Sequence, residues 1–224
     1  YDVSHQRVEV RETMQAALSA AHAISTHAVV NEVDYFTAAD DIPGQDAGAG
    51  HVNEAMFNSA CFYKHFAIDW GKLVENLNND VNLASITVKC FLEAAAKANP
   101  SGKQHAFAAF NYPDGILVEV KTESSTPVSY ANAFADPVSP KSSRGLIGES
   151  ISRFGQYVRD LSNGYGIKAE RFWFSSSKRH SLTYVEDNQE NPVIGENGNF
   201  GEFAKFMSHV MKTVNNEPVI GAAS

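Results

Sequence analysis

The pattern of apolar and polar positions predicts a chain that mixes helices with strands. Apolar residues recur every three to four positions in some stretches, which is typical of amphipathic helices. Helices are therefore predicted at 8–25, 70–77, 83–98, 129–136, 147–161 and 202–213. Other stretches are rich in β-branched and aromatic residues, which favour strands. Strands are predicted at 28–39, 56–68, 105–110, 115–121 and 168–175.

Turn-forming residues organise these strands into two hairpins. Asp40-Asp41-Ile42-Pro43-Gly44 separates the first two strands, so residues 31–62 are predicted to form a long hairpin. Asn111-Tyr112-Pro113-Asp114 joins the strands at 105–110 and 115–121 into a second hairpin. Asn163-Gly164 ends a helix, and the acidic segment 184–200 is predicted to be a loop. The order of elements indicates an α+β fold with mostly antiparallel pairing.

The composition is that of an ordinary globular domain. Hydrophobic residues make up 43% of the 224 residues, and no apolar run reaches the length of about 20 residues that a membrane-spanning helix needs. We therefore expect no membrane association. Two cysteines, Cys61 and Cys90, exclude a disulfide scaffold and fit a reducing, cytoplasmic compartment, where both are expected in the core. The start at Tyr1 shows none of the features of a signal peptide.

Charge is distributed unevenly along the chain. The formal net charge is -8, which argues mildly against nucleic-acid binding. Residues 31–54 contain six acidic residues and no Lys or Arg, whereas residues 141–179 contain eight basic and three acidic residues. Such a division fits either two solvated faces or subunits that stack head to tail.

No recognisable catalytic constellation is present. His22 and His27 are five residues apart, the wrong spacing for a helical zinc pair, and His27 is instead predicted to cap the end of the first helix. Asp34, Asp40 and Asp41 lack the spacing of a calcium loop and fit a solvated acidic hairpin. We therefore expect a non-catalytic protein without metal or cofactor.

Two segments are candidates for contact with nucleic acid. Tyr35, Phe36 and Thr37 place aromatic side chains on the first hairpin, where they could wedge between bases or pack on the paired strand. Lys103 and Gln104 follow Pro100-Ser101-Gly102 before a predicted strand and offer donors to a phosphate backbone. Gly-Lys at such a turn is common, so this second signal is weak by itself.

Several motifs in order resemble one family. They are Ala20-Ala21-His22-Ala23-Ile24-Ser25-Thr26-His27, Val33-Asp34-Tyr35-Phe36-Thr37-Ala38-Ala39-Asp40-Asp41, Phe57-Asn58-Ser59-Ala60-Cys61-Phe62-Tyr63, Lys103-Gln104 with Ala108-Ala109-Phe110-Asn111, Ser129-Tyr130-Ala131-Asn132-Ala133-Phe134 and Asn163-Gly164-Tyr165-Gly166. From about Met14 to Gly166 the chain resembles the CasC family, the crRNA-binding backbone subunits of the subtype I-E CRISPR Cascade complex in the RAMP superfamily. Beyond Gly166 the resemblance is weak.

The resemblance implies a ribonucleoprotein role in antiviral defence. Family members polymerise as a filament along crRNA, and a hairpin thumb over an RNA-recognition-motif-like (ferredoxin-like) palm kinks the guide, so that target DNA pairs in short segments. Carried over, Tyr35, Phe36 and Thr37 would contact the guide at the thumb, with Phe36 and Thr37 as the wedge. Lys103 and Gln104 would contact the guide backbone from the palm. Asp40, Asp41 and His51 would meet a neighbouring copy, and other Cascade subunits are further expected partners.

The resemblance also implies a division of the chain. Residues 1–30 and 63–166 would form a partial palm, 31–62 the thumb, and 167–224 a C-terminal strand, acidic loop and helix. The first palm strand and a basic N-terminal region of the family have no counterpart here, so a fragment with weak RNA affinity is expected. Two alternatives stay open: an assembly module without RNA affinity, and a metal-dependent nuclease using Asp34, Asp40 and Asp41 with His22 or His51.

Overall fold

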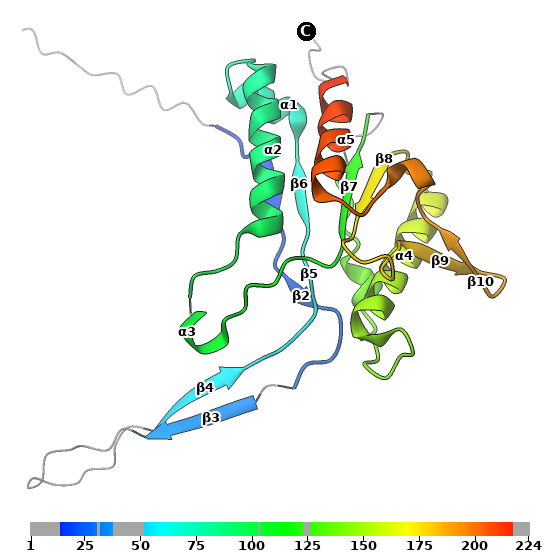
Figure 1. The fold of residues 1–224 in the computed structure, drawn as a ribbon. Helices are drawn as coiled ribbons and strands as arrows, with labels where there is room; N and C mark the ends of the chain where they lie inside the picture. Colours follow the sequence, from blue (N-terminus) through cyan, green and yellow to red (C-terminus); the bar gives the residue numbers. More distant parts are fainter. Residues whose placement is uncertain (1–13, 31, 38–51, 103, 123–125, 217–224) are drawn as a thin grey trace, which may run out of the picture.

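The main sheet is built around strand β8 (Glu170–Phe174). The computed structural model describes residues 14–30, 32–37, 52–102, 104–122 and 126–216. β7 (Ile116–Val120) lies antiparallel to β8, with Ile116 opposite Phe174, and β11 (Asn199–Phe200) lies parallel on its other side. Among the described pairings all others are antiparallel. These pairings confirm the α+β class (Figure 1).

Alternating side chains of β8 give the sheet a helix on each face. Phe172 and Phe174 are buried against α5 (Phe203–Asn216), in a cluster that includes Phe206 and Val210. Trp173 points the opposite way and packs with residues from α4 (Gly145–Tyr165) and the following chain: Ile151, Leu182 and Ile194. The largest fully buried side chains lie in this half of the chain, between residues 138 and 210. The core therefore sits around β8.

Helix α4 extends one turn further than its sequence suggests. It passes through Asn163 and Gly164 and ends at Tyr165, because Gly166 takes the left-handed conformation (φ 62°) that closes a helix. After β8, the predicted loop at 184–200 is wrong in part. β9 (Thr183–Glu186) and β10 (Gln189–Pro192) form a tight hairpin, followed by the short η2 (Glu196–Gly198) and β11.

The other half of the molecule combines two small strand pairs with two capped helices. β1 (Leu18–Ala20) pairs with β6 (Phe66–Ile68), and β2 (Ile24–Ser25) pairs with β5 (Phe62–Tyr63). The helix predicted at 8–25 is thus wrong over its described part, and so is the helix-capping role of His27. Its alanines favour a helix locally, but backbone pairing with β5 and β6 decides the conformation.

The two helices of this half were predicted correctly. α1 (Trp70–Asn76) begins at Asp69, whose carboxylate accepts a hydrogen bond from the Lys72 amide. α2 (Val81–Lys97) begins at Asp80, which accepts one from the Leu83 amide, and ends before Pro100. α2 lies beside α5, where Ser85 Oγ donates a 2.6 Å hydrogen bond to Asn215 Oδ1 (Figure 1).

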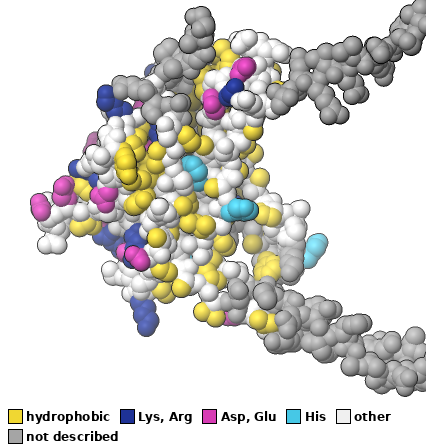
Figure 2. Space-filling view, turned by 180° about the vertical axis from the view of Figure 1, so that it is seen from behind, with side chains coloured by type: hydrophobic (Ala, Val, Ile, Leu, Met, Phe, Trp, Pro, Cys, Tyr) yellow, Lys and Arg dark blue, Asp and Glu magenta, His cyan; other side chains and the backbone are white. Residues whose placement is uncertain are grey.

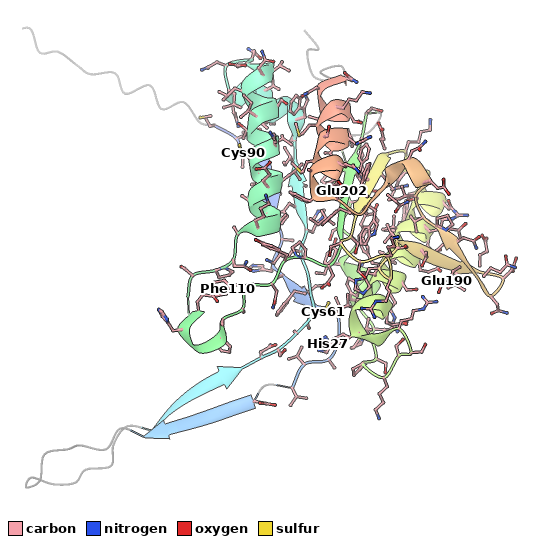
Figure 3. All side chains as sticks on the ribbon, viewed as in Figure 1. His27, Cys61, Cys90, Phe110, Glu190 and Glu202 are labelled. Carbon is pink, nitrogen blue, oxygen red and sulfur yellow. The ribbon has the colours of Figure 1, made fainter. Side chains whose placement is uncertain are left out.

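Helix α2 buries small apolar residues and leaves larger ones exposed. The buried residues are Ala84 and Val88, whereas Leu83, Ile86 and Cys90 are exposed. Cys90 is therefore no core residue, and Cys61 is only half-buried (Figure 3). Leu83 and Ile86 thus lie outside the core, whereas Leu92 packs against it.

The predicted first hairpin is confirmed. β3 (Glu32–Thr37) and β4 (Val52–Phe57) pair from Glu32 with Phe57 to Thr37 with Val52. The hairpin projects from the body of the molecule (Figure 1). The second predicted hairpin is wrong, because 104–107 form a helical turn, α3 (Gln104–Phe107), and β7 pairs with β8 instead. The short helix predicted near 129–136 is present as η1 (Ala131–Phe134).

Charged side chains are concentrated on one side of the surface. Dark blue and magenta groups gather at the left of Figure 2, over the side that carries α4, β9 and β10. Hydrophobic groups reach the surface through the middle of the same face. None of the helices in the described ranges is long and apolar enough to cross a membrane.

Candidate nucleic-acid interface

The predicted wedge residues lie on the outer part of the projecting hairpin. Tyr35 is opposite Glu54, Phe36 opposite Asn53 and Thr37 opposite Val52 in the β3–β4 register. The three residues therefore lie on β3 of the hairpin that projects from the body of the molecule (Figure 1).

The other predicted residues are placed less completely. Lys103, Asp40, Asp41 and His51 lie outside the described residues. Gln104 opens α3 rather than preceding a strand, and its amide nitrogen donates to the Pro100 carbonyl, which closes the turn. Its Oε1 atom is buried without a hydrogen-bond partner among the described residues. No group of three His, Cys, Asp or Glu side chains in the described ranges is arranged to hold a metal ion.

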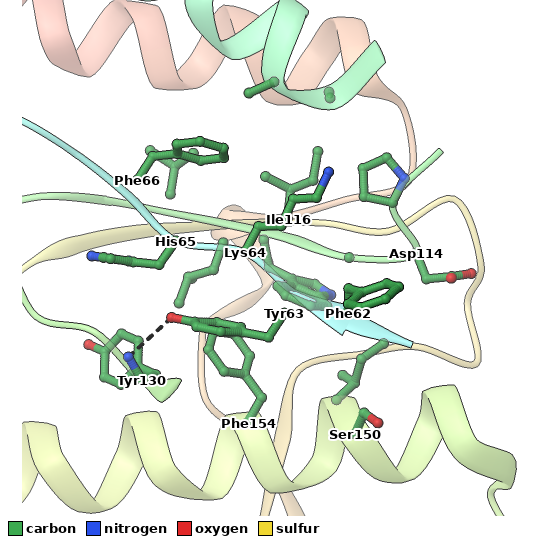
Figure 4. Close-up of a pocket in the computed structure, with 18 of the residues that line it drawn as sticks. Phe62, Tyr63, Lys64, His65, Phe66, Asp114, Ile116, Tyr130, Ser150 and Phe154 are labelled. Atoms are coloured by element: carbon green, nitrogen blue, oxygen red, sulfur yellow. Dashed lines mark hydrogen bonds between the residues drawn. The ribbon is translucent and has the colours of Figure 1, made fainter. Parts of the chain in front are cut away.

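A wide cleft of about 2510 Å³ separates the two halves of the molecule. One wall is formed by residues 58–71, which include β5 and β6, and the other by residues 107–122, which include β7. Helix α4 forms the floor in Figure 4, with α2 and α5 above. Phe62, Tyr63, Ile116 and Phe154 extend into the space between them (Figure 4).

Two strand edges border this cleft. Among the described pairings, β6 pairs only with β1 and β7 only with β8, so each strand has one edge without a ladder partner. Residues of β6 and β7 line the cleft, whereas those of β1 do not. The free edges of β6 and β7 therefore face the same opening, and each presents backbone groups that a further strand could pair with.

One end of the cleft carries a network of charged and phenolic groups centred on Glu119. Its Oε1 atom accepts hydrogen bonds from Tyr130 Oη (2.8 Å) and Arg171 Nε (2.7 Å). Lys121 Nζ lies 3.9 Å from Oε2, and Tyr63 Oη accepts from the Tyr130 amide at 3.1 Å. The side chains of Glu119 and Arg171 are only 11% and 15% exposed. This network joins β7, β8 and the chain before η1.

Burial shifts the pKa values of several side chains at this end of the cleft. It raises the pKa of Tyr130, an effect that the neighbouring Glu119 carboxylate strengthens, and it raises the pKa of Tyr63. Burial likewise lowers the pKa of Lys121 and of His65. The two phenols therefore stay protonated and act as hydrogen-bond donors or acceptors, a positioning role rather than one in proton transfer.

The network was not found by sequence reasoning. In the sequence, Tyr63 and Tyr130 belong to the motifs that resemble the family, and Glu119 and Arg171 lie in predicted strands. Glu119 and Arg171 are 52 residues apart, and pairing of β7 with β8 brings them opposite each other. The sequence feature that could have indicated this network is the presence of charged residues in two mostly apolar strands.

Chemically, the arrangement fits binding better than catalysis. The described residues of the cleft offer aromatic surfaces, hydrogen-bonding groups and free strand edges. Arg171, the cation at the centre of the network, is already paired with Glu119 and also donates to Ser162.

Comparisons with known proteins find one matching family model and similar chains in solved structures. The family model of CT1975-like proteins matches residues 8–197. A chain from a structure described as a CRISPR RNA-guided surveillance complex is 30% identical, with 88% of this chain and 70% of that one covered and a TM-score of 0.69. A second, from such a complex described as pre-nicking, is 28% identical, with 90% and 51% covered and a TM-score of 0.71. No curated protein matches.

Proposed function

The chain belongs to the CT1975-like protein family, and from this membership we propose that it is the crRNA-binding backbone subunit of a CRISPR Cascade complex. The observation that carries the proposal is its 30% identity, over 88% of its length, to a chain of an RNA-guided surveillance complex. Similarity to such chains supports a Cascade-type, non-enzymatic role. The assignment to the CasC subunits of subtype I-E is part of the proposal.

In this proposal the β3–β4 hairpin is the thumb. Phe36 and Thr37 separate neighbouring guide nucleotides, and Tyr35 also contacts the guide. Lys103 and Gln104 contact the guide backbone. Successive copies meet through Asp40, Asp41 and His51 and form a filament, in which the target DNA pairs with short segments of guide. The projection of the hairpin beyond the core supports this arrangement, because nothing in the described body covers it (Figure 1).

The palm of the proposed subunit is the part of the molecule around the cleft. An RNA-recognition-motif-like sheet would be completed by a strand lying between β6 and β7. The two free edges that face one opening support this position. The chains it resembles are longer than the part matched here, at 70% and 51% coverage.

The test is guide binding in the assembled complex with two substitutions, Phe36→Ala and Lys103→Ala. Fluorescence anisotropy with labelled guide RNA at several salt concentrations should show weaker binding for both. Lys103→Ala should also lower the salt slope by about 0.7, the value for one phosphate contact on a single strand. Tyr165→Ala and Lys89→Ala remove an aromatic and a cation from exposed positions elsewhere and serve as matched controls.

A second candidate function follows from the charge. At -8, the chain could join the complex through protein contacts alone, without affinity for RNA. Under that function the four variants would assemble normally and would bind guide like the wild type. That outcome would contradict the guide-binding role and leave the assembly role.

A further inference from the structure

A short basic loop closes the end of the cleft opposite the Glu119 network. It consists of residues 175–181, Ser-Ser-Ser-Lys-Arg-His-Ser, between β8 and β9. Lys178, Arg179 and His180 line the cleft together with Asp114. In Figure 4, Asp114 lies at the far end of the cleft from His65 and Tyr130. The guide-contact residues proposed above are not part of this loop.

The loop is held in one shape by its own hydrogen bonds. The His180 amide donates to the Ser177 carbonyl at 3.0 Å, and the Arg179 amide donates to Ser177 Oγ at 3.3 Å. The buried indole of Trp173 donates to the His180 carbonyl at 2.9 Å and fixes the loop to the sheet. Lys178 and Arg179 are therefore presented from a fixed backbone, which reduces the entropy lost when they bind a ligand.

The two cations of the loop differ from three arginines of the same half, each of which has a carboxylate partner. Arg144 pairs with Glu190, Arg159 with Glu186 and Arg171 with Glu119. Lys178 and Arg179 are exposed, and the described part of the chain supplies no carboxylate within ion-pair distance of either. An exposed pair of adjacent, unneutralised cations is suited to a polyanion.

Two exposed aromatic side chains lie on the segment that leads to the loop. Phe110, labelled in Figure 3, and Tyr112 are 65% and 70% exposed and line the same cleft, between α3 and β7. Tyr112 stands two residues before Asp114, whose Oδ1 atom is 3.9 Å from His180 Nδ1. The segment that carries the aromatic residues therefore runs up to the basic loop.

From this juxtaposition we propose that Lys178, Arg179, Tyr112 and Phe110 form a second binding surface for single-stranded nucleic acid. The cations contact backbone phosphates, and the aromatic rings stack on bases. Basic groups beside exposed aromatic rings are the combination that binds single strands with little sequence preference. The inference rests on the proposed function for the kind of ligand, but it uses none of the residues assigned there.

The first experiment measures the salt dependence of binding. The double variant Lys178→Gln/Arg179→Gln in the assembled protein is compared with Lys89→Gln/Lys212→Gln, which removes two exposed cations from α2 and α5. The probes are labelled single strands of one mixed sequence, as RNA and as DNA. Loss of two phosphate contacts should lower the slope of log K against log salt by about 1.4 for the loop variant. The control variant should keep the wild-type slope.

The two probes distinguish the strand that is bound. If the loop variant lowers the salt slope with the RNA probe only, the surface binds the guide. If it lowers the slope with both probes, the surface binds any exposed single strand, including target DNA. Equal slopes for the loop variant, the control and the wild type overturn the inference while the guide-binding role stands. Absence of binding by the wild type overturns both.

The second experiment locates the contact directly. Ultraviolet crosslinking of the wild type to an oligouridine probe, followed by mass spectrometry, should yield adducts at Tyr112 or Phe110. Tyr112→Leu, which is exposed and carries no described side-chain bond, should weaken binding about tenfold. Adducts found only on the hairpin, together with unchanged affinity of Tyr112→Leu, would contradict the proposal.

Discussion

At the scale of single residues, Glu119 has the largest structural role in the cleft. Its carboxylate accepts from both Tyr130 and Arg171 and lies near Lys121. Removing the charge of Glu119 leaves Arg171 and Lys121, two largely buried cations, without the carboxylate that lies near both. Removal of one partner of a buried ion pair lowers stability more than replacement of the whole pair by apolar residues, because the remaining charge stays desolvated.

We therefore expect Glu119→Gln to lower the free energy of unfolding by about 2 kcal/mol. Urea denaturation followed by circular dichroism measures this. The matched control is Glu202→Gln, which removes an exposed pair with Lys205 and should change stability by less than about 0.5 kcal/mol. Equal effects of the two substitutions would show that the network contributes no more than a surface ion pair.

How far single residues could be predicted depended on the range of their contacts. The start of the helix predicted at 70–77 is correct, because the Asp69 cap that begins it involves only the next three residues. The Glu119–Arg171 pair could not be predicted, because it requires the pairing of β7 with β8. Cys90 was assigned to the core from the habits of its residue type, but its position on α2 places it outside.

At the scale of elements, Gly155 determines how closely α4 approaches β9. A Cβ atom at Gly155 would lie 2.2 Å from the backbone oxygen of Thr183, a distance that no real contact allows. The same helix contains Gly164, around which nothing lies within 4 Å of an added Cβ. The two glycines therefore differ in packing but share the helical backbone.

Gly155→Ala is expected to destabilise the protein by about 2 kcal/mol or more, because α4 must move away from β9. Gly164→Ala should stabilise it by up to about 1 kcal/mol, since alanine favours the helix. Thermal unfolding of both variants tests the pair of expectations. Similar melting temperatures for the two would mean that α4 and β9 are not closely packed.

Elements were predictable where local pattern and tertiary contacts agree. α1, α2, α4, α5, β7 and β8 have strong periodicity or β-branched composition and were found. The segment at 14–25 has the spacing of a helix yet forms β1 and β2, because β5 and β6 supply partners for its backbone. On α2 the small Ala84 and Val88 form the buried face, whereas Cys90, which was expected in the core, is exposed.

At the scale of the whole molecule, the cleft is bordered by two free strand edges. If one strand completes the sheet on assembly, it pairs with β6 on one side and β7 on the other. The amide hydrogens of both β6 and β7 should then exchange with solvent more slowly in the assembled complex than in the free protein. Hydrogen exchange with mass spectrometry measures this, with peptides from α5 as the internal control. Protection of one edge alone would contradict a shared strand.

The overall arrangement was only partly accessible from the sequence. The α+β class and the projecting hairpin follow from local patterns. The cleft does not, because its walls come from segments about 50 residues apart that are brought together by the fold. Of the predicted site residues, Tyr35, Phe36 and Thr37 lie on strand β3 of the hairpin, and Gln104 lies in a helical turn instead of before a strand.

The uneven distribution of the core has a consequence for the life of the protein in the cell. Most fully buried side chains lie around β8, and few lie in the half with β1, β2, β5 and β6. Segments with few buried contacts open more often and are reached first by proteases. If the chain assembles as proposed, we expect an unassembled copy to be cut first on that side, and an assembled copy to be protected there. Degradation would then remove surplus subunits and keep their number matched to the complexes formed.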